Sequence, residues 1–297
     1  MKGKVGVVGV GNMGFNMVRE LKEAGYTVFA RDVDKKAEER AKSLGAEIVS
    51  SPKEMANYVT VFLLSLPMPS HVKEVVLGKD GILESPKAGS VIVDLSTVDP
   101  FSTQENAKEA EKHGIGYIDA PVLGRPQACG NWTLPVGGKK EDLEKVEEVL
   151  KVLAKRIIHV GPSGWGNIVK LLNNMMLGAI NSITCEIFAI CKKLGMNPKV
   201  FYETIAESGA ASVSGLFKEL GPKIYKRDFE PLFAVELLHK DMDLGIKMAK
   251  KVGVPLFVSE TNQLLNEIAK LKGWGKEDTA SVVKVYEDIL GIEVKEE

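Results

Sequence analysis

The chain has 297 residues, of which 44% are hydrophobic and 27% are charged, and its formal net charge at pH 7 is -1. This length accommodates one large or two ordinary domains with a substantial core. The charge balance argues against a protein that binds nucleic acid through a basic surface, so we expect no nucleic-acid partner.

The sequence favours a cytoplasmic protein without a membrane span. Its three cysteines form no CxxC pair, which is typical of a reducing compartment. The opening MKGKVGVVGVG leads into a glycine motif and not into a signal-peptide cleavage site. The longest apolar segment, 171–191, is interrupted by three asparagines and Glu186, so we expect a buried helix there.

Short β-branched runs alternate with amphipathic stretches over the first half of the chain. This alternation is typical of βαβ units and a parallel sheet, and the continuous apolar runs indicate a sheet covered on both faces. We expect strands near 5–10, 26–31, 59–66, 90–95 and 115–120, and two more in WTLPV and RIIHV. The helical stretches are MGFNMVRELKEAG, DPFSTQENAKEAEKHG and KKEDLEKVEEVLKVLAK.

The first predicted strand continues into GVGNMG, which places Gly9, Gly11 and Gly14 in a GxGxxG spacing at the start of a helix. That context favours a dinucleotide-binding turn over an ordinary tight turn. Gly9 permits the turn, Gly11 lets the backbone approach a pyrophosphate, and Gly14 lets the helix pack on the strand. We include Asn12 and Met13 in this cofactor site, because the helix N-terminus offers N–H groups to phosphate.

The second predicted strand ends at Asp32, 18 positions after Gly14. This is close to the spacing of the acid that accepts hydrogen bonds from the adenosine ribose. A carboxylate there repels a 2′-phosphate, so NAD is the preferred cofactor and NADP remains an alternative. Arg31 complicates the preference, because a flexible guanidinium can offset that repulsion, and an ordinary solvent-facing strand end is the other interpretation of Asp32.

Strand signals stop after about residue 162. Residues 164–194 are expected to form one long helix that ends at Gly195, and shorter helices follow between proline-containing breaks. We therefore predict an α/β fold with two domains. The first is a Rossmann-type dinucleotide-binding domain over 1–162, and the second is an all-α domain for substrate binding and oligomerisation over 163–297, joined by the long helix.

The long helix begins with GPSGWGNIVKLLNNMM, an apolar stretch that carries three polar side chains on one face. Lys170, Asn173 and Asn174 stand at i, i+3 and i+4. Such side chains are expensive to bury without partners, so this face meets either water or a polar ligand.

Together these motifs resemble the β-hydroxyacid dehydrogenases, a family that includes 3-hydroxyisobutyrate dehydrogenase and tartronate semialdehyde reductase. The resemblance covers essentially the whole chain, with six motifs in the family's order: GVGNMG, SLPMP, DLSTVDP, DAPVLGRP, GWGNIVKLLNN and HKDMDL. It implies an NAD(P)-dependent oxidoreductase that acts on a small 3-hydroxy acid or its semialdehyde. It also implies a homo-oligomer, a dimer or a tetramer, because members of the family pair through the second domain.

The resemblance also implies roles for individual residues. Lys170 would be the catalytic lysine, and Asn174 would orient the substrate. Besides the glycine turn and Asp32, the residues implied for the cofactor are Leu66, Pro67, Thr97 and Lys240. The residues implied for a substrate carboxylate and its surroundings are Ser96, Val122, Leu123, Gly124, Arg125 and Asn174.

The expected chemistry agrees with a lysine at this position. Oxidation of an alcohol by hydride transfer requires loss of the hydroxyl proton, and reduction requires its return to the oxygen. A lysine performs both steps if partial burial and nearby positive charge bring its pKa toward neutrality. Its protonated form also stabilises negative charge on the carbonyl oxygen.

The sequence departs from the family's pattern in the substrate loop. Relatives commonly have Ser-Gly-Gly after DAPV, where the serine and the backbone amides bind the substrate carboxylate. Here these positions hold Leu123, Gly124 and Arg125. Gly124 retains a backbone N–H, and Arg125 is either a bidentate carboxylate ligand or an exposed loop charge. The identity of the substrate stays open.

Other oxidoreductase classes fit less well. A zinc-dependent alcohol dehydrogenase needs a cluster of Cys and His ligands that the sequence lacks, so we expect no metal. A short-chain dehydrogenase needs a Tyr-x-x-x-Lys pair, which is also missing. An imine reductase-like enzyme and a non-catalytic dinucleotide-binding scaffold remain as alternatives, and Lys170 argues against both.

Overall fold

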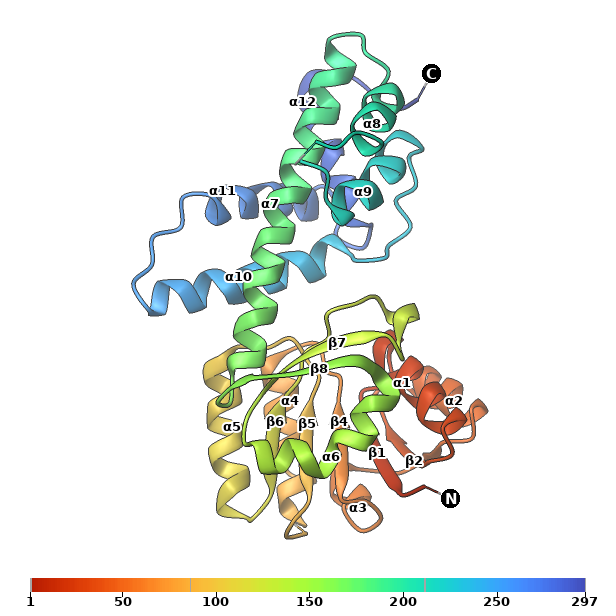
Figure 1. Ribbon diagram of the computed structural model, residues 1–297, viewed down its shortest axis with the longest axis vertical. Coiled ribbons are helices and arrows are strands. Elements are labelled where there is room, and N and C mark those ends of the chain that lie inside the picture. Colours follow the sequence, from red (N-terminus) through yellow and green to blue (C-terminus); the bar gives the residue numbers. More distant parts are fainter. Residues whose placement is uncertain (1, 86, 211, 297) are drawn as a thin grey trace. The chain divides into compact units, whose positions relative to one another are not determined.

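The computed structural model of the chain describes residues 2–85, 87–210 and 212–296. They form two compact units, which divide between Lys170 and Leu171. The first unit is a sheet with helices around it, and the second consists of helices (Figure 1). The predicted boundary near residue 162 lies before the long helix, whereas the compact units divide within it.

The sheet of the first unit contains eight strands within the described residues, in the order β3-β2-β1-β4-β5-β6-β7-β8. Their neighbours pair in parallel except for β6 and β7, which are antiparallel among the strands described. The strands are β1 (Lys4–Val8), β2 (Thr27–Arg31), β3 (Glu47–Ile48), β4 (Val61–Leu64), β5 (Val91–Asp94), β6 (Gly116–Asp119), β7 (Trp132–Gly137) and β8 (Ala154–Gly161). All the predicted strands are present, and β3 is the one that the sequence pattern does not indicate.

Both faces of the sheet are buried, because successive strand residues point to opposite sides. Val7 belongs to an apolar cluster with residues of α1, α2 and α6, whereas the next residue, Val8, belongs to a second cluster with α3, α4 and α5. The helices are α1 (Asn12–Glu23), α2 (Lys35–Ser43), α3 (Pro52–Met55), α4 (Pro69–Leu77), α5 (Pro100–Lys112) and α6 (Lys140–Leu153), with short 3-10 turns at Ile82–Glu84 and Pro126–Ala128. The prediction of a sheet covered on both faces is confirmed.

The long helix α7 spans Trp165–Lys193, close to the predicted 164–194. It ends before Gly195, whose φ of 79° is one that residues with a Cβ rarely adopt. The helices of the second unit then follow: α8 (Pro198–Ala206), α9 (Gly215–Tyr225), α10 (Val235–Lys251), α11 (Ser259–Leu271), the 3-10 turn Thr279–Val282 and α12 (Val283–Leu290). Its core forms where Phe188 of α7 packs with apolar residues of α9, α10, α11 and α12.

Helix α7 is long and apolar enough to cross a membrane by length and composition, and it is the one such helix among the described residues. Half of its most apolar window is buried within the fold. Its asparagines Asn167, Asn174 and Asn181 are also buried, and each forms hydrogen bonds with other elements. These contacts are typical of the core helix of a folded domain.

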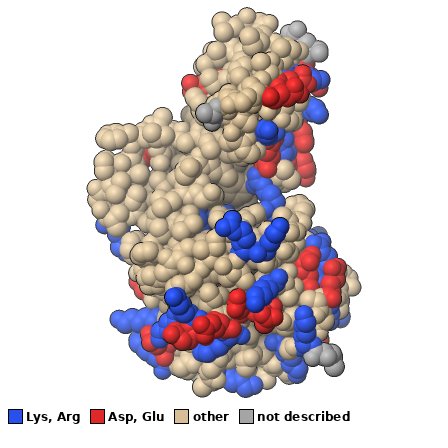
Figure 2. Space-filling view, viewed as in Figure 1, with Lys and Arg blue, Asp and Glu red and all other residues tan. Residues whose placement is uncertain are grey.

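Charges of both signs are interspersed over the first unit on the face shown in Figure 2. The region around α10 and α11 in the second unit shows few charged side chains on the same face (Figure 2). A surface of mixed sign agrees with the formal net charge of -1 and offers no extended basic stripe on this face.

Candidate active site

The turn between β1 and α1 has the shape that a dinucleotide pyrophosphate requires. A Cβ at Gly9 would collide with the Ser65 carbonyl oxygen, and a Cβ at Gly14 would collide with that of Gly9. A Cβ at Gly11 would meet nothing within 4 Å, so the backbone is open to a ligand there. No side chain caps α1 and its first turn carries no acidic residue. Unopposed N–H groups at a helix N-terminus attract phosphate, and the turn therefore fits this cofactor.

Asp32 follows the last residue of β2, and two backbone groups fix its carboxylate. Val10 N–H donates to Oδ2 at 2.7 Å, and Asp34 N–H donates to Oδ1 at 2.9 Å. The first bond joins Asp32 directly to the glycine turn. A carboxylate oxygen accepts more than one hydrogen bond, so this anchoring leaves lone pairs for a ribose.

The ends of β4, β5 and β6 are joined by a buried polar network. The Leu66 N–H donates to Ser96 Oγ at 2.9 Å, and the Ser96 N–H donates to Asp94 Oδ1 at 3.0 Å. The hydroxyl of Tyr117 donates to Asp94 Oδ2 at 2.9 Å. Burial raises the pKa of Asp94 to about 6, although these hydrogen bonds oppose the rise. Ser96 is itself buried, and its hydroxyl holds the two loops predicted to line the cofactor.

The predicted substrate loop is held against β7. Leu123 and Thr133 exchange two backbone hydrogen bonds, of 3.0 and 3.2 Å, so the Leu123 N–H is already engaged. The indole N–H of the buried Trp132 donates to the Arg125 carbonyl at 2.8 Å. A Cβ at Gly124 would lie 2.6 Å from that indole, so only glycine fits there without displacement. To this loop Gly124 contributes a backbone N–H and Arg125 contributes a guanidinium, whereas the side chain of Val122 is buried.

The N-terminus of α7 is anchored to the carboxyl end of β6. Asp119 accepts the N–H of Gly164 at 2.7 Å on one oxygen and the N–H of Asn167 at 2.8 Å on the other. The amide oxygen of Asn167 accepts the N–H of Val98 at 3.0 Å, in the loop after β5. Burial raises the pKa of Asp119, although the backbone hydrogen bonds lower it. Lys170 lies one turn beyond Asn167 on the same helix, as the last residue of the first unit.

The second unit brings together Asn174 and Lys240, which the family resemblance implies for substrate and cofactor. Both contact Asp241 of α10: Asn174 Nδ2 donates to Oδ2 at 2.5 Å, and Lys240 Nζ lies 2.7 Å from Oδ1. The amide oxygen of Asn174 accepts from Asn173 Nδ2 at 3.0 Å. Asp241 is 3% exposed. The hydrogen bond between Asn174 and Asp241 therefore connects the predicted polar face of α7 to α10.

Four positioning residues were missed in the sequence, namely Asp94, Asp119, Asn167 and Asp241. Each stands inside a recognised motif: DLSTVDP, DAPVLGRP, GWGNIVKLLNN and HKDMDL. For the three aspartates, an acid at the end of an apolar strand or beside a lysine is the signal that could have identified them. The residues described by the structure contain no group of three or more His, Cys, Asp or Glu side chains that could hold a metal ion.

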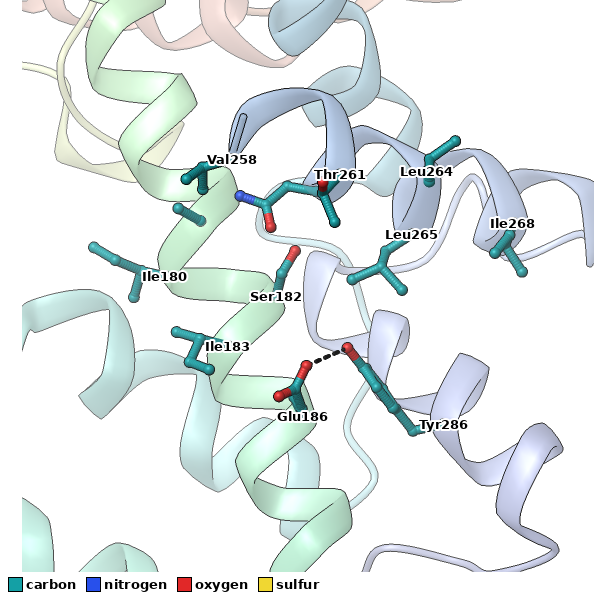
Figure 3. A pocket seen from close by; sticks show the side chains of 12 residues that line it. Ile180, Ser182, Ile183, Glu186, Val258, Thr261, Leu264, Leu265, Ile268 and Tyr286 are labelled. Carbon is teal, nitrogen blue, oxygen red and sulfur yellow. Dashed lines mark hydrogen bonds between the residues drawn. The ribbon is translucent and has the colours of Figure 1, made fainter. Parts of the chain in front are cut away.

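The second unit also has an apolar hollow of about 640 Å³ between α7, α11 and α12. Figure 3 shows Ile180 and Ile183 of α7 opposite Leu264, Leu265 and Ile268 of α11. At one end, the hydroxyl of Tyr286 donates to Glu186 at 3.1 Å (Figure 3). The apolar side chains dominate the lining, so this hollow is distinct in character from the polar cluster around Asp241.

A doubly covered parallel sheet, an open glycine turn at a helix N-terminus and an anchored ribose-type acid define a dinucleotide-binding protein of the Rossmann type. Residues 4–161 match the NAD binding domain of 6-phosphogluconate dehydrogenase. Residues 164–286 match the family described as NAD-binding of NADP-dependent 3-hydroxyisobutyrate dehydrogenase.

Individual relatives match over nearly their full length. The chain is 35% identical to 2-(hydroxymethyl)glutarate dehydrogenase of Eubacterium barkeri, over 98% of this chain and 97% of that protein. It is 30% identical to mitochondrial 3-hydroxyisobutyrate dehydrogenase of Mus musculus, over 95% and 86% of the two chains. The crystal structure of 3-hydroxyisobutyrate dehydrogenase from Salmonella typhimurium superposes with a TM-score of 0.86 at 26% identity, covering 96% of this chain and all of that one.

The chain therefore belongs to the β-hydroxyacid dehydrogenase family. It is an NAD(P)-dependent oxidoreductase that transfers a hydride between a nicotinamide cofactor and a hydroxy acid or the matching aldehyde. The predicted family, fold class and reaction class are confirmed.

Proposed function

We propose that the enzyme interconverts a small 3-hydroxy carboxylic acid and its semialdehyde, with Lys170 as the general acid and base and Asn174 as the substrate-orienting amide. The observation that carries the proposal is the anchoring of α7: Asp119 and Asn167 fix the turn that leads to Lys170. A proton-transfer group needs such a rigid support, because small displacements of a reacting group reduce rates strongly. The names of the relatives support the substrate class.

In reduction, the ammonium of Lys170 donates a proton to the substrate's carbonyl oxygen and stabilises the negative charge that develops there. In oxidation, the neutral amine accepts the hydroxyl proton. The bound nicotinamide supplies or accepts the hydride. Asn174 donates through Nδ2, because the Asp241 carboxylate accepts hydrogen bonds and fixes which end of the amide carries the N–H groups. Leu66, Pro67 and Thr97 line the nicotinamide end, and Ser96 holds their loops together.

The substrate carboxylate binds at the loop after β6. Serine is replaced by Leu123, whose N–H already donates to Thr133. The Gly124 N–H and the Arg125 guanidinium take over the carboxylate, and a guanidinium can bind it with two parallel hydrogen bonds. The indole N–H of Trp132 donates to the Arg125 carbonyl and so fixes the backbone at this position.

NAD is the preferred cofactor, and NADP is the weaker one. Asp32 is held by Val10 and Asp34 in the orientation that leaves its carboxylate for the ribose hydroxyls. We further propose a cytoplasmic homo-oligomer, a dimer or tetramer, that associates through the second unit. The exposed apolar side chains around the hollow, such as Ile183 and Leu264, support this association.

The first experiment measures initial rates with small semialdehydes, glyoxylate and 3-hydroxy acids, each with NAD(H) and NADP(H). We expect turnover with a small semialdehyde or its 3-hydroxy acid. Lys170→Ala should lower kcat/KM by about 100-fold or more, the range that a general acid or base contributes. Lys193→Ala, at the far end of the same helix, is the matched control and should retain the parent's rates.

Cofactor binding is measured by calorimetry on the same variants, and Lys170→Ala should bind the dinucleotide as the parent does. Near-parental turnover in Lys170→Ala would overturn the role assigned to this lysine. Turnover of imines, and not of any carbonyl compound in the panel, would overturn the proposed substrate class.

A further inference from the structure

The end of β2 and the start of α2 carry two cations beside the proposed ribose acid. Arg31 and Lys35 flank Asp32, and both contact the same carboxylate, that of Glu38 in α2. Arg31 Nη1 lies 2.6 Å from Glu38 Oε1, and Lys35 Nζ lies 2.8 Å from Glu38 Oε2. Arg31 also donates to the backbone carbonyl of Asp32. The Arg31 guanidinium is therefore held by Glu38 and by the backbone of the adjacent Asp32.

Glu38 is unusually placed for a helical glutamate, because its side chain is only 6% exposed. It also accepts the backbone N–H of Asp32 at 3.2 Å. Burial by itself raises the pKa of this carboxyl, but the hydrogen bonds from Lys35, Arg31 and Asp32 outweigh it and lower the pKa overall. Glu38 is thus a buried anion that engages both cations and the backbone of the ribose acid.

The net charge of these side chains determines whether the cluster favours a 2′-phosphate on the adenosine ribose. The carboxylates of Asp32 and Glu38 balance the cations of Arg31 and Lys35, so the four side chains carry no net charge. A 2′-phosphate brings negative charge, and an arginine near the ribose is the group that accommodates it. Without the Glu38 charge, the same cluster would carry one net positive charge and an arginine released from its partner.

We propose that Glu38 is a specificity-determining residue, which excludes NADP by engaging Arg31 so that the guanidinium does not serve a 2′-phosphate. Glu38 acts through Arg31 and does not contact the cofactor itself. This inference rests on the proposed preference for NAD, and it gives that preference a second cause besides the charge of Asp32. It also assigns a purpose to the burial of the Glu38 carboxylate, because ion pairs of this kind by themselves contribute little to stability.

The test compares the parent with Glu38→Gln, Arg31→Ala and the double variant. Glu38→Gln should raise the ratio of kcat/KM for NADP to that for NAD by about tenfold or more, the worth of one charge-assisted hydrogen bond. The gain should come from a lower KM for NADP, with kcat for NAD retained. Arg31→Ala alone should leave the ratio at the parental value, because the guanidinium is already engaged. The double variant should return to that value, because the gain requires a released Arg31.

Dissociation constants for NAD and NADP, measured by calorimetry, give the same ratio without turnover. An unchanged ratio in Glu38→Gln, or an equal gain in the double variant, would overturn the proposal. A fall in NADP binding in Arg31→Ala would also overturn it, since Arg31 would then already serve the phosphate. If Glu38→Gln is unstable, Glu38→Ala, which also removes the carboxylate, is measured in its place and should raise the same ratio. A parent that prefers NADP would refute the proposed cofactor preference, whereas the response to Glu38→Gln tests Glu38 separately.

Discussion

Asp241 determines how two predicted site residues present their polar atoms. A carboxylate only accepts hydrogen bonds, so the amide of Asn174 must turn Nδ2 toward it, as the 2.5 Å contact shows. The other oxygen lies 2.7 Å from Lys240 Nζ and offsets its charge. We therefore infer that Asp241 is a positioning residue, which links Asn174, the proposed substrate-orienting amide, to Lys240, which the family resemblance implies for the cofactor.

Asp241→Asn should impair both partners. The introduced amide removes the charge opposite Lys240 and directs N–H groups toward Asn174. We expect kcat/KM to fall by about tenfold or more, with a raised KM for substrate and weaker cofactor binding, measured by steady-state kinetics and calorimetry. Asp243→Asn is the matched control, because Asp243 lies on the same helix and pairs with Lys247. Parental KM and cofactor affinity in Asp241→Asn would contradict the positioning role.

Residues proposed to touch ligands are easier to indicate from the sequence than residues that hold them in place. Gly9, Gly14 and Asp32 are indicated by spacing, because backbone sterics and ribose chemistry restrict those positions strongly. Asp119 and Asp241 are not, because an acid gains a positioning role only from neighbours that folding supplies, 45 or 67 residues away in sequence. The contacts of Glu38 with Arg31 and Asp32 likewise appear only once α2 packs beside β2.

The titratable carboxyl group of Asp94 connects the ends of β4, β5 and β6 through hydrogen bonds. Its carboxylate joins the loop after β5 to Tyr117 of β6, and through Ser96 to the loop after β4. Burial raises its pKa from 3.8 to about 6, so the folded protein binds this proton more tightly than the unfolded chain does. The contribution of Asp94 to stability therefore declines as the pH rises from about 4 to 6, and the loss is complete above that window.

Asp94→Asn should remove this decline, because the amide keeps the shape and an acceptor for the Ser96 N–H but carries no charge. Relative to the parent, the variant should become more stable as the pH rises, so that the difference between its free energy of unfolding and the parent's increases by on the order of 2 kcal/mol between pH 4.5 and pH 7.5. Urea unfolding at several pH values measures it. Glu39→Gln, at an exposed position of α2, is the control and should track the parent. A constant difference between Asp94→Asn and the parent across this range would contradict the expectation.

Secondary structure was predicted well wherever burial is continuous. The strands of the sheet interior are apolar runs, and α7 was predicted within a residue or two at each end because a glycine follows it. The strand β3 contains only Glu47 and Ile48, a segment too short for any hydrophobic period. It forms because the neighbouring β2 offers an unpaired edge, which is a property of the assembled sheet and not of the local sequence.

The two units differ in how much apolar side-chain surface they leave exposed. The first closes its sheet between two layers of helices, whereas most of the exposed large apolar side chains of the described chain belong to the second unit. Among them, Ile183, Val258 and Leu264 line the hollow between α7, α11 and α12. A soluble protein that exposes such a surface normally covers it by association. The net charge of -1 leaves little repulsion between copies, which supports the proposed homo-oligomer.

Leu264→Glu tests this association directly, because the charge enters an apolar hollow that a second copy would have to desolvate. We expect the parent to sediment as a dimer or tetramer at micromolar concentration, and Leu264→Glu to shift it to the mass of a single chain, measured by analytical ultracentrifugation. Leu271→Glu is the matched control, since Leu271 is 87% exposed on the same helix but lies outside the hollow. A monomeric parent would refute the homo-oligomer. An oligomeric Leu264→Glu variant with the parent's mass would show that the copies meet through another surface.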